Sequence, residues 1–344
     1  MQTRMLNEGP LHHRNGRLTE VGYAYSLLKS YDRQRIKAPR YRIKEWDYYL
    51  VCSEHAGIAF TIADNGYMGM CSVSLLDFTE KAQHTQSFIT WFPMGKLNLP
   101  ASSAGGNSRI AGKNYELNFV TSGSKREIYG HIYDFKEKGT QLLFDLELKN
   151  PPQDSMVIVT PFRKKPHHFY YNQKINCLPA QGRVIFGQKD IYFSPATAFG
   201  VLDWGRGVWP YSNEWYWGSA SGIVNGRAFG LNIGHGFGDT SNATENMLFY
   251  GGKASKLGQV SFEVPRVNGK LDYLAPWQVT DGDNRLNLRF EPILDRAAHI
   301  NTVVLSSDQH QVFGRFTGTA ILDDGMTLHI ENLIGFLEKV KNRW

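Results

Sequence analysis

The chain has 344 residues, of which 42% are hydrophobic and 20% charged, so it is long enough for two domains with buried cores. No apolar run reaches the length of about 20 residues that spans a bilayer, and the first residues lack a secretory signal pattern. The three cysteines, Cys52, Cys71 and Cys177, are too sparse for a disulfide framework or a structural zinc site. We therefore expect a reduced, cytoplasmic protein without a metal or another cofactor.

The formal net charge is +6, and much of the excess lies between residues 33 and 44. Such a run can form a patch for nucleic acid or anionic headgroups, or a solvated strand face. We favour the solvated face, because no nucleic-acid motif accompanies the run. No nucleic-acid partner is expected, contact with a membrane surface is the weaker alternative, and the sequence leaves the oligomeric state open.

In chain order, the sequence reads mostly as short strands separated by turn signals. Residues 141–148 (QLLFDLEL) predict a strand, and residues 317–332 (TGTAILDDGMTLHIEN) predict a hairpin with an Asp-Asp-Gly turn. Two segments favour helices instead: residues 18–28, and residues 332–344, where Leu333, Leu337, Val340 and Trp344 share one helical face. Many short strands with few helices are typical of a sandwich or barrel.

An internal repeat divides the chain into two similar halves. Glu45-Trp46 matches Glu214-Trp215, Leu117-Asn118 matches Leu286-Asn287, and Phe144 matches Phe313, always 169 residues apart. Chance matches between two β-rich halves would scatter over many offsets, so we favour an ancient duplication. The predicted organisation is an N-terminal extension (1–39), a first β-barrel-like unit (40–185) and a second one that carries the C-terminal helix (186–344).

The stretch DWGRGVWPYSNEWYWGSASG (203–222) contains four of the eight tryptophans, beside Asp203 and Arg206. An Asp–Arg pair that locks a turn is the ordinary interpretation. The functional alternative is a cavity walled by Trp209 and Tyr211, where an apolar setting raises the pKa of the carboxyl group.

The next stretch, RAFGLNIGHGFGD (227–239), alternates between large residues and glycines. It follows a Val-Asn-Gly turn, which predicts a hairpin with the strand of Trp215 and Trp217. The tryptophans can lean over the glycine face, or a ligand can fill the space. Strand parity places His235 with the phenylalanines instead of with the glycines, unless a bulge reverses it.

Polar residues 239–246 (DTSNATEN) can satisfy each other in a turn or form the rim of a cavity. Two sets of candidates follow from these stretches. The proton-handling candidates are Asp203, Asp239 and Glu245. The ligand-contact candidates are Arg206, Trp209, Tyr211, Trp215, Trp217, His235 and Asn246.

Taken together, DWGRGVWPY, WYWGSASG, GFGDTSNATEN and the C-terminal HQVFGRFTG resemble a bacterial family known as domain of unknown function 2804. More distantly, the chain is similar to tandem calycin or lipocalin-like proteins, such as the AttH-like group and the carotenoid 1,2-hydratases. The resemblance implies an all-β fold of two tandem antiparallel lipocalin-like barrels. It also implies an apolar ligand, since some of those proteins add water to an isoprenoid double bond in a cavity with Asp, His, Trp and Tyr.

Three functions remain open from the sequence. The first is an enzyme that acts on an apolar molecule, as a hydratase, isomerase or lyase, with a carboxylic acid that protonates an alkene. The second is a non-catalytic carrier or sensor of a lipid, for which the carboxylates serve only local turns. The third is a carbohydrate-binding protein, which needs exposed tryptophans. We favour binding of a small apolar molecule and leave catalysis undecided.

Overall fold

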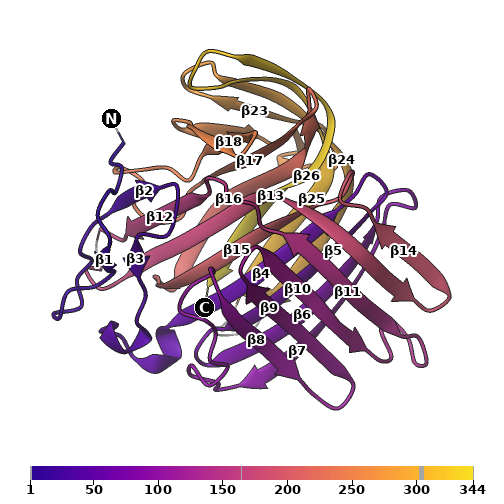
Figure 1. Cartoon of the computed structure of the whole chain (residues 1–344), viewed down its shortest axis with the longest axis horizontal. Coiled ribbons are helices and arrows are strands. Elements are labelled where there is room, and N and C mark those ends of the chain that lie inside the picture. The colour runs from indigo at the N-terminus through magenta and orange to yellow at the C-terminus, as the bar shows by residue number, and fades with distance from the viewer. Residues whose placement is uncertain (1, 164, 302–305, 344) are drawn as a thin grey trace.

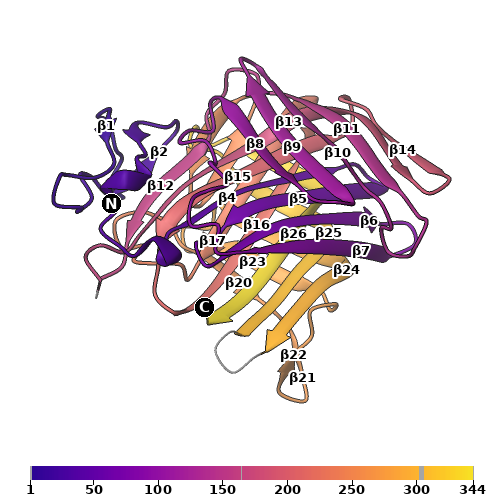
Figure 2. The same cartoon turned by 90° about the horizontal axis from the view of Figure 1, so that it is seen from below.

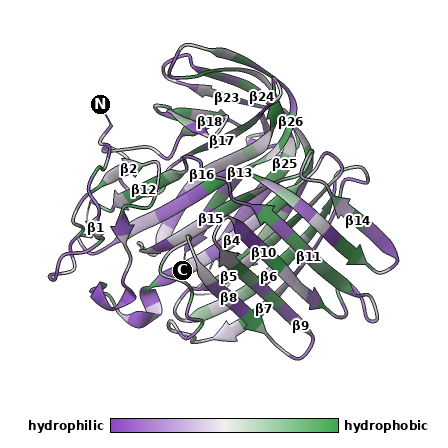
Figure 3. Cartoon of the chain, viewed as in Figure 1, coloured by the Kyte–Doolittle hydropathy of each residue, from purple (hydrophilic) through white to green (hydrophobic). Residues whose placement is uncertain are grey.

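The computed structural model describes residues 2–163, 165–301 and 306–343, which fold into two large antiparallel sheets, each curled into a half-barrel (Figure 1). The all-β, tandem architecture expected from the sequence is confirmed. Among the described residues there is no α-helix, only two 3₁₀ turns, at Arg33–Arg35 and Arg40–Arg42, where hydrophilic residues predominate (Figure 3). No helix in these ranges has the length and hydropathy needed to cross a membrane.

The first sheet has the strand order β7-β6-β5-β4-β15-β13-β11-β10-β9-β8; β12 and β14 also pair with β13, and β2 pairs with β12. Its strands are β2 (Gly22–Ala24), β4 (Lys44–Cys52), β5 (Ala56–Asp64), β6 (Met68–Asp77), β7 (Ala82–Trp91), β8 (Gly106–Ala111), β9 (Tyr115–Ser122), β10 (Lys125–Ile132), β11 (Leu142–Lys149), β12 (Met156–Pro161), β13 (Phe169–Phe186), β14 (Lys189–Phe193) and β15 (Phe199–Val208).

The second sheet has the order β19-β18-β17-β16-β26-β25-β24-β23-β20. Its strands are β16 (Ser212–Val224), β17 (Arg227–His235), β18 (Met247–Tyr250), β19 (Lys253–Lys256), β20 (Val260–Glu263), β23 (Trp277–Asp281), β24 (Leu286–Asn301), β25 (Ser306–Ile321) and β26 (Thr327–Arg343). Two small ribbons complete the described chain: β1 (Gly9–Pro10) with β3 (Lys29–Ser30), and β21 (Arg266–Val267) with β22 (Lys270–Leu271).

The two sheets repeat one topology. Without β15, the first sheet has the order β7-β6-β5-β4-β13-β11-β10-β9-β8, and the second has the order β19-β18-β17-β16-β26-β25-β24-β23-β20. Strands at the same position in these two orders also come in the same order along their halves of the chain, so β4 corresponds to β16 and β13 corresponds to β26. Trp46 and Trp215 lie near the starts of the corresponding strands β4 and β16, and Phe144 and Phe313 lie on the corresponding strands β11 and β25. The pair Leu117 and Leu286 does not follow this rule, because β9 corresponds to β23 and Leu286 lies on β24.

β15 departs from the repeat. It pairs with β4 on one side and β13 on the other, although its residues belong to the stretch that the sequence assigned to the second unit. Every residue of β15 is buried, because one face lines the interior of the first sheet and the other faces the second sheet. Gly205 makes this possible, since a Cβ at that position would lie 2.0 Å from the ring of Trp46.

Apolar side chains form a core inside each half-barrel and a third core between the sheets. The inter-sheet core joins Tyr48, Leu50 and Val201 of the first sheet to Trp217, Phe313 and Phe336 of the second. Figure 2 shows the strands of the first sheet lying against β16, β25 and β26. This contact region also holds several buried charged side chains, as is typical of a ligand-binding or catalytic site.

The expected C-terminal helix is wrong, because residues 327–343 form strand β26 between β16 and β25. Residues Leu333–Glu338 are buried on both faces where β26 passes between the two half-barrels. A strand buried on both faces has a continuous apolar run, which mimics the helical spacing of Leu333, Leu337 and Val340. The helix expected at 18–28 is wrong as well, since that stretch contributes only the short strand β2.

Candidate functional site

Five aromatic rings meet where the two sheets come together. The ring of Phe237 lies 4.9 Å from Tyr170, 5.3 Å from Trp209 and 5.2 Å from Trp215, measured between centroids. Trp46 completes this group of five, 5.4 Å from Trp209 and 6.0 Å from Tyr170, and Phe162 contacts Phe237 as well, at 5.7 Å. We call this group the aromatic box. Its walls come from β4, β13, β16 and the segment after β15, and Phe237 follows β17.

Phe237 sits in the middle of the aromatic box on a segment with unusual backbone freedom. The residues on either side, Gly236 and Gly238, have φ angles of +95° and +76°, in the left-handed region that side chains disfavour. A Cβ on Gly238 would also lie 2.5 Å from the side chain of Thr160. Glycines at both positions let the backbone direct the Phe237 ring inward between the four aromatic walls.

Charged side chains are buried next to the aromatic box. Lys174 and Asp203 are directly opposite each other on β13 and β15, and they form an ion pair of 3.0 Å. Asn172 donates a second hydrogen bond of 2.5 Å to Asp203, and the Lys174 ammonium lies 3.9 Å above the ring of Trp217. These contacts offset the cost of burying both charges.

Two glutamates flank this ion pair and complete what we call the inter-sheet charged cluster: Lys174, Asp203, Glu245 and Glu338. Burial raises the pKa of Glu338 to about 7, against the opposing effect of the hydrogen bond from Trp215 and the charges of Arg296 and Lys174. Burial also raises the pKa of Glu245, and the negative charge of Asp203 adds to that shift. The Oε2 atom of Glu245 is buried and makes no hydrogen bond within the described structure.

Glu338 connects the charged cluster to the aromatic box. Its Oε1 accepts a hydrogen bond of 3.0 Å from Nε1 of Trp215, whose ring packs against Phe237. Its Oε2 accepts from Gln311, and Gln311 also bonds to Tyr48 across the sheet contact. The side chain is only 5% exposed. A carboxyl group with a pKa of about 7 therefore touches an aromatic wall.

The predicted pairing of Asp203 with Arg206 is wrong. Residues three apart in a strand point to opposite faces, so Asp203 faces the second sheet and Arg206 faces the interior of the first. Arg206 is fully buried there, 3.0 Å from Asp47, with its guanidinium 4.3 Å above the ring of Trp204. Asp203 takes Lys174 as its partner instead.

The other predicted residues lie in several different places. Trp209, Trp215, Trp217 and Glu245 lie in the aromatic box or beside the charged cluster. His235 stacks on Tyr216 at 4.8 Å and contacts Phe262, so it faces the core of the second half-barrel with Phe229, as strand parity predicted. The same parity placed it with Phe237, which is wrong, because Phe237 lies in the aromatic box. Asn246 is buried and accepts a hydrogen bond from the Gly234 amide.

Asp239 and Tyr211 lie nearer the surface than the residues of the charged cluster. Asp239 pairs with the exposed Arg163 at 2.6 Å, and the hydrogen bond from that guanidinium lowers the pKa of the carboxyl group. Tyr211 is 49% exposed.

The glycine face of β17 has different neighbours from those expected. A Cβ on Gly230 would lie 2.7 Å from Sγ of Cys177, and one on Gly234 would lie 2.5 Å from Oε1 of Glu245. Of the three tryptophans expected to pack against this face, Trp217 lies beside it, opposite Gly234 and bonded to Asn232, whereas Trp209 and Trp215 contact Phe237. The hairpin prediction itself is confirmed, since β16 and β17 pair through a turn at Asn225-Gly226.

Two small cavities of about 20 Å³ lie away from the aromatic box, each with room for roughly one water molecule. One lies inside the first sheet beside Asp47, Ser103 and Arg126, and the other lies between the sheets beside Cys52, Gly200 and Ser221. In this structure Phe237 fills the space enclosed by the aromatic walls.

Residues 2–344 match the family described as domain of unknown function 2804. The chain belongs to this family. Its fold is similar to an AttH-like protein from Nitrosomonas europaea, with a TM-score of 0.57 and 15% identity over 90% of this chain and 97% of the other. A kievitone hydratase from Nectria haematococca aligns over 88% of each chain with 9% identity and a TM-score of 0.49. No curated protein sequence matches the chain.

The sequence did not point to Glu338, Lys174, Phe237, Tyr170 or Trp46 as site residues. Glu338 and Lys174 lie on strands that are far from the tryptophan-rich stretch in the sequence but next to it in the fold. Only the match of Trp46 with Trp215 in the internal repeat could have indicated that Trp46 belongs to the site. Equivalent strands of two facing sheets bring equivalent residues to the same interface.

Proposed function

We propose that the protein binds a small apolar molecule in the aromatic box, in the place that the Phe237 ring occupies here. The observation that carries the proposal is the shared wall: Trp215 contacts both Phe237 and the carboxyl group of Glu338. Four aromatic walls with one polar group directed at them are typical of sites for small apolar ligands. The two glycines beside Phe237 support a movement that withdraws the ring when a ligand enters.

The chemistry that fits this site is protonation of an alkene, as in a hydratase, isomerase or lyase. Glu338 has a pKa of about 7, so a large fraction of the carboxyl groups carry a proton at neutral pH. The rings of Trp209 and Trp215 would stabilise a carbocation formed beside them. Glu245, with an unpaired oxygen and a raised pKa, is the second carboxyl group that such a reaction needs to accept a proton. Three free, buried cysteines are compatible with the reducing cytoplasm, where we place this activity.

Binding is tested with farnesol as a probe, by tryptophan fluorescence and native mass spectrometry. We expect Trp209→Ala to weaken binding at least tenfold, and Phe237→Ala to strengthen it because the competing ring is gone. Trp91→Ala is the matched control, since Trp91 is 63% exposed on β7. Equal affinities for all four proteins would overturn the assignment of the site.

Catalysis is tested by incubating farnesol with the protein in D₂O and measuring deuterium uptake into the alkenes. Glu338→Gln should abolish uptake without weakening binding more than a few fold. Binding without uptake in the wild type would instead identify a carrier, which is the second candidate. The carrier is favoured by one observation: the ring of Phe237 itself occupies the aromatic box.

A further inference from the structure

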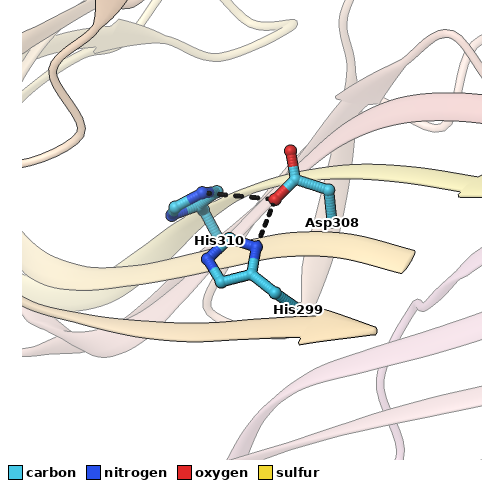
Figure 4. Close-up of side chains that lie close together, drawn as sticks. All are labelled: His299, Asp308 and His310. Atoms are coloured by element: carbon cyan, nitrogen blue, oxygen red, sulfur yellow. Dashed lines mark ion pairs between the residues drawn. The ribbon is translucent and has the colours of Figure 1, made fainter. Parts of the chain in front are cut away.

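Two histidines and an aspartate come together on adjacent strands of the second sheet (Figure 4). His299 of β24 is directly opposite Asp308 of β25, and His310 lies two residues beyond Asp308 on the same face. The next residue, Gln311, points to the opposite face, where it bonds to Glu338. The His299–Asp308–His310 group is therefore distinct from the inter-sheet charged cluster.

The spacing of the three side chains is close to what a metal ion requires. Oδ1 of Asp308 lies 2.6 Å from Nδ1 of His299 and 3.6 Å from Nε2 of His310, and all three ligand atoms lie within 4.8 Å of one another. Tetrahedral zinc with bonds of about 2.0–2.1 Å places its ligand atoms roughly 3.3 Å apart. His299 and Asp308 are 61% and 53% exposed, so both can rotate by the small amount needed.

His310 is already oriented for this role. Its Nδ1 donates to Oδ2 of Asp295 at 2.6 Å, and its ring stacks on Tyr273 with centroids 3.7 Å apart. The side chain is only 15% exposed. A carboxylate behind one ring nitrogen fixes the tautomer that leaves the other nitrogen, Nε2, free to bind a metal. In the present structure that nitrogen points at Asp308.

The local charge also suits a cation. Asp295 and Asp308 supply two negative charges beside the two histidines, which favours a cation at this position. Of the nearby basic residues on β26, Lys339 is opposite His310 and pairs with Glu214 at 3.2 Å. Lys341 is opposite Asp308, where its charge competes with a metal.

We propose that His299, Asp308 and His310 form a binding site for a divalent transition metal, of the class to which zinc belongs. Two imidazoles and one carboxylate are ligands that zinc accepts, and three protein ligands leave a fourth position for water or another molecule. Asp295 acts as a positioning residue for His310. Metal binding joins β24 to β25 at the end of the sheet and stabilises the folded chain in proportion to its affinity.

The test uses the full chain, freed of metal with a chelator and titrated with ZnCl₂ by calorimetry and with CoCl₂ by visible absorption. We expect one ion per chain and Co²⁺ bands of a tetrahedral site. His299→Ala, His310→Ala and Asp308→Asn should each weaken binding at least a hundredfold. His329→Ala, an exposed histidine on β26 of the same sheet, should leave binding unchanged.

Asp295→Asn tests the positioning role. It should weaken binding ten- to a hundredfold and shift the Co²⁺ spectrum, while the thermal midpoint of the metal-free protein stays within a few degrees of wild type. The proposal is overturned if the wild type takes up no ion at 1 mM, or if the His299→Ala/Asp308→Asn double variant binds as tightly as the wild type. Failure of the farnesol experiments would not affect this result.

Discussion

Trp215 donates a hydrogen bond of 3.0 Å to Glu338, and this contact ties the aromatic wall of one half-barrel to the charged residues between the two. The bond crosses from β16 to β26, which are neighbours in the second sheet. Because Glu338 is buried, its protonation state affects both the stability of the folded protein and the proposed chemistry of the site.

Glu338 should make the protein less stable as the pH rises. Its folded pKa of about 7 lies above the ordinary value of 4.5, so the folded state holds a proton that the unfolded state has released. This contribution is fully present below about pH 4.5 and is lost as the pH rises to about 7. Glu338→Gln should flatten that slope and stabilise the protein above pH 7 by roughly 2–3 kcal/mol.

Urea denaturation between pH 4.5 and 8 measures this effect. Glu331→Gln, at an exposed position on the same strand, serves as the control and should keep the slope of the wild type. A Glu338→Gln protein with an unchanged slope would show that this carboxyl group ionises normally.

Breaking the Lys174–Asp203 pair should be strongly destabilising. Lys174→Met leaves a buried carboxylate without its partner and removes the cation above the Trp217 ring, so we expect a loss of about 3–5 kcal/mol. Lys174→Met/Asp203→Asn removes both charges and should recover most of the loss. Equilibrium denaturation of the three proteins decides the point, and a double variant no more stable than the single one would contradict it.

Gly234→Val should destabilise the protein through Glu245. The new side chain would collide with the Glu245 carboxylate and the carbonyl oxygen of Tyr216, at a cost of about 1–3 kcal/mol. Combining it with Glu245→Ala should reduce that cost, which a double-mutant cycle measures. Gly282→Val is the control, because a Cβ there meets nothing within 4 Å. Additive effects of the two changes would exclude Glu245 as the obstacle.

The cysteine thiols should be inert in the folded protein. All three are buried and free, and burial raises the pKa of Cys71 and of Cys177 to about 12. The thiolate is the reactive form, so a disulfide reagent such as DTNB at pH 8 should modify fewer than one cysteine per chain until urea is added. Rapid modification without denaturant would mean that the inter-sheet region opens readily.

Strand parity explains what could be predicted of the site and what could not. Alternation placed His235 correctly with Phe229 but wrongly with Phe237, and the Asn225-Gly226 turn set the β16–β17 hairpin. The same alternation separates Asp203 from Arg206, which their closeness in the sequence concealed. The internal repeat predicted two tandem units, and the resemblance added that each is a lipocalin-like barrel, whereas the strand pattern alone reached only a sandwich or barrel.

Glu338 and Phe237 could not be found from the sequence for different reasons. The segment of Glu338 is buried on both faces, so its apolar run imitated a helix and hid the alternation. Phe237 follows β17 in a segment where positive φ angles at two glycines break the strand pattern. The partners of both residues come from other strands, and sequence periodicity carries no information about which strands become neighbours.

The placement of β15 has a consequence for how the chain folds during synthesis. β4 and β13 are neighbours of β15 and not of each other, so the first half-barrel lacks its central strand until residues 199–208 have left the ribosome. A fragment ending at residue 185 would expose two open strand edges to other chains. The first half-barrel therefore cannot complete its sheet until the start of the second half of the chain has been synthesised. Until then, the nascent chain needs protection from aggregation.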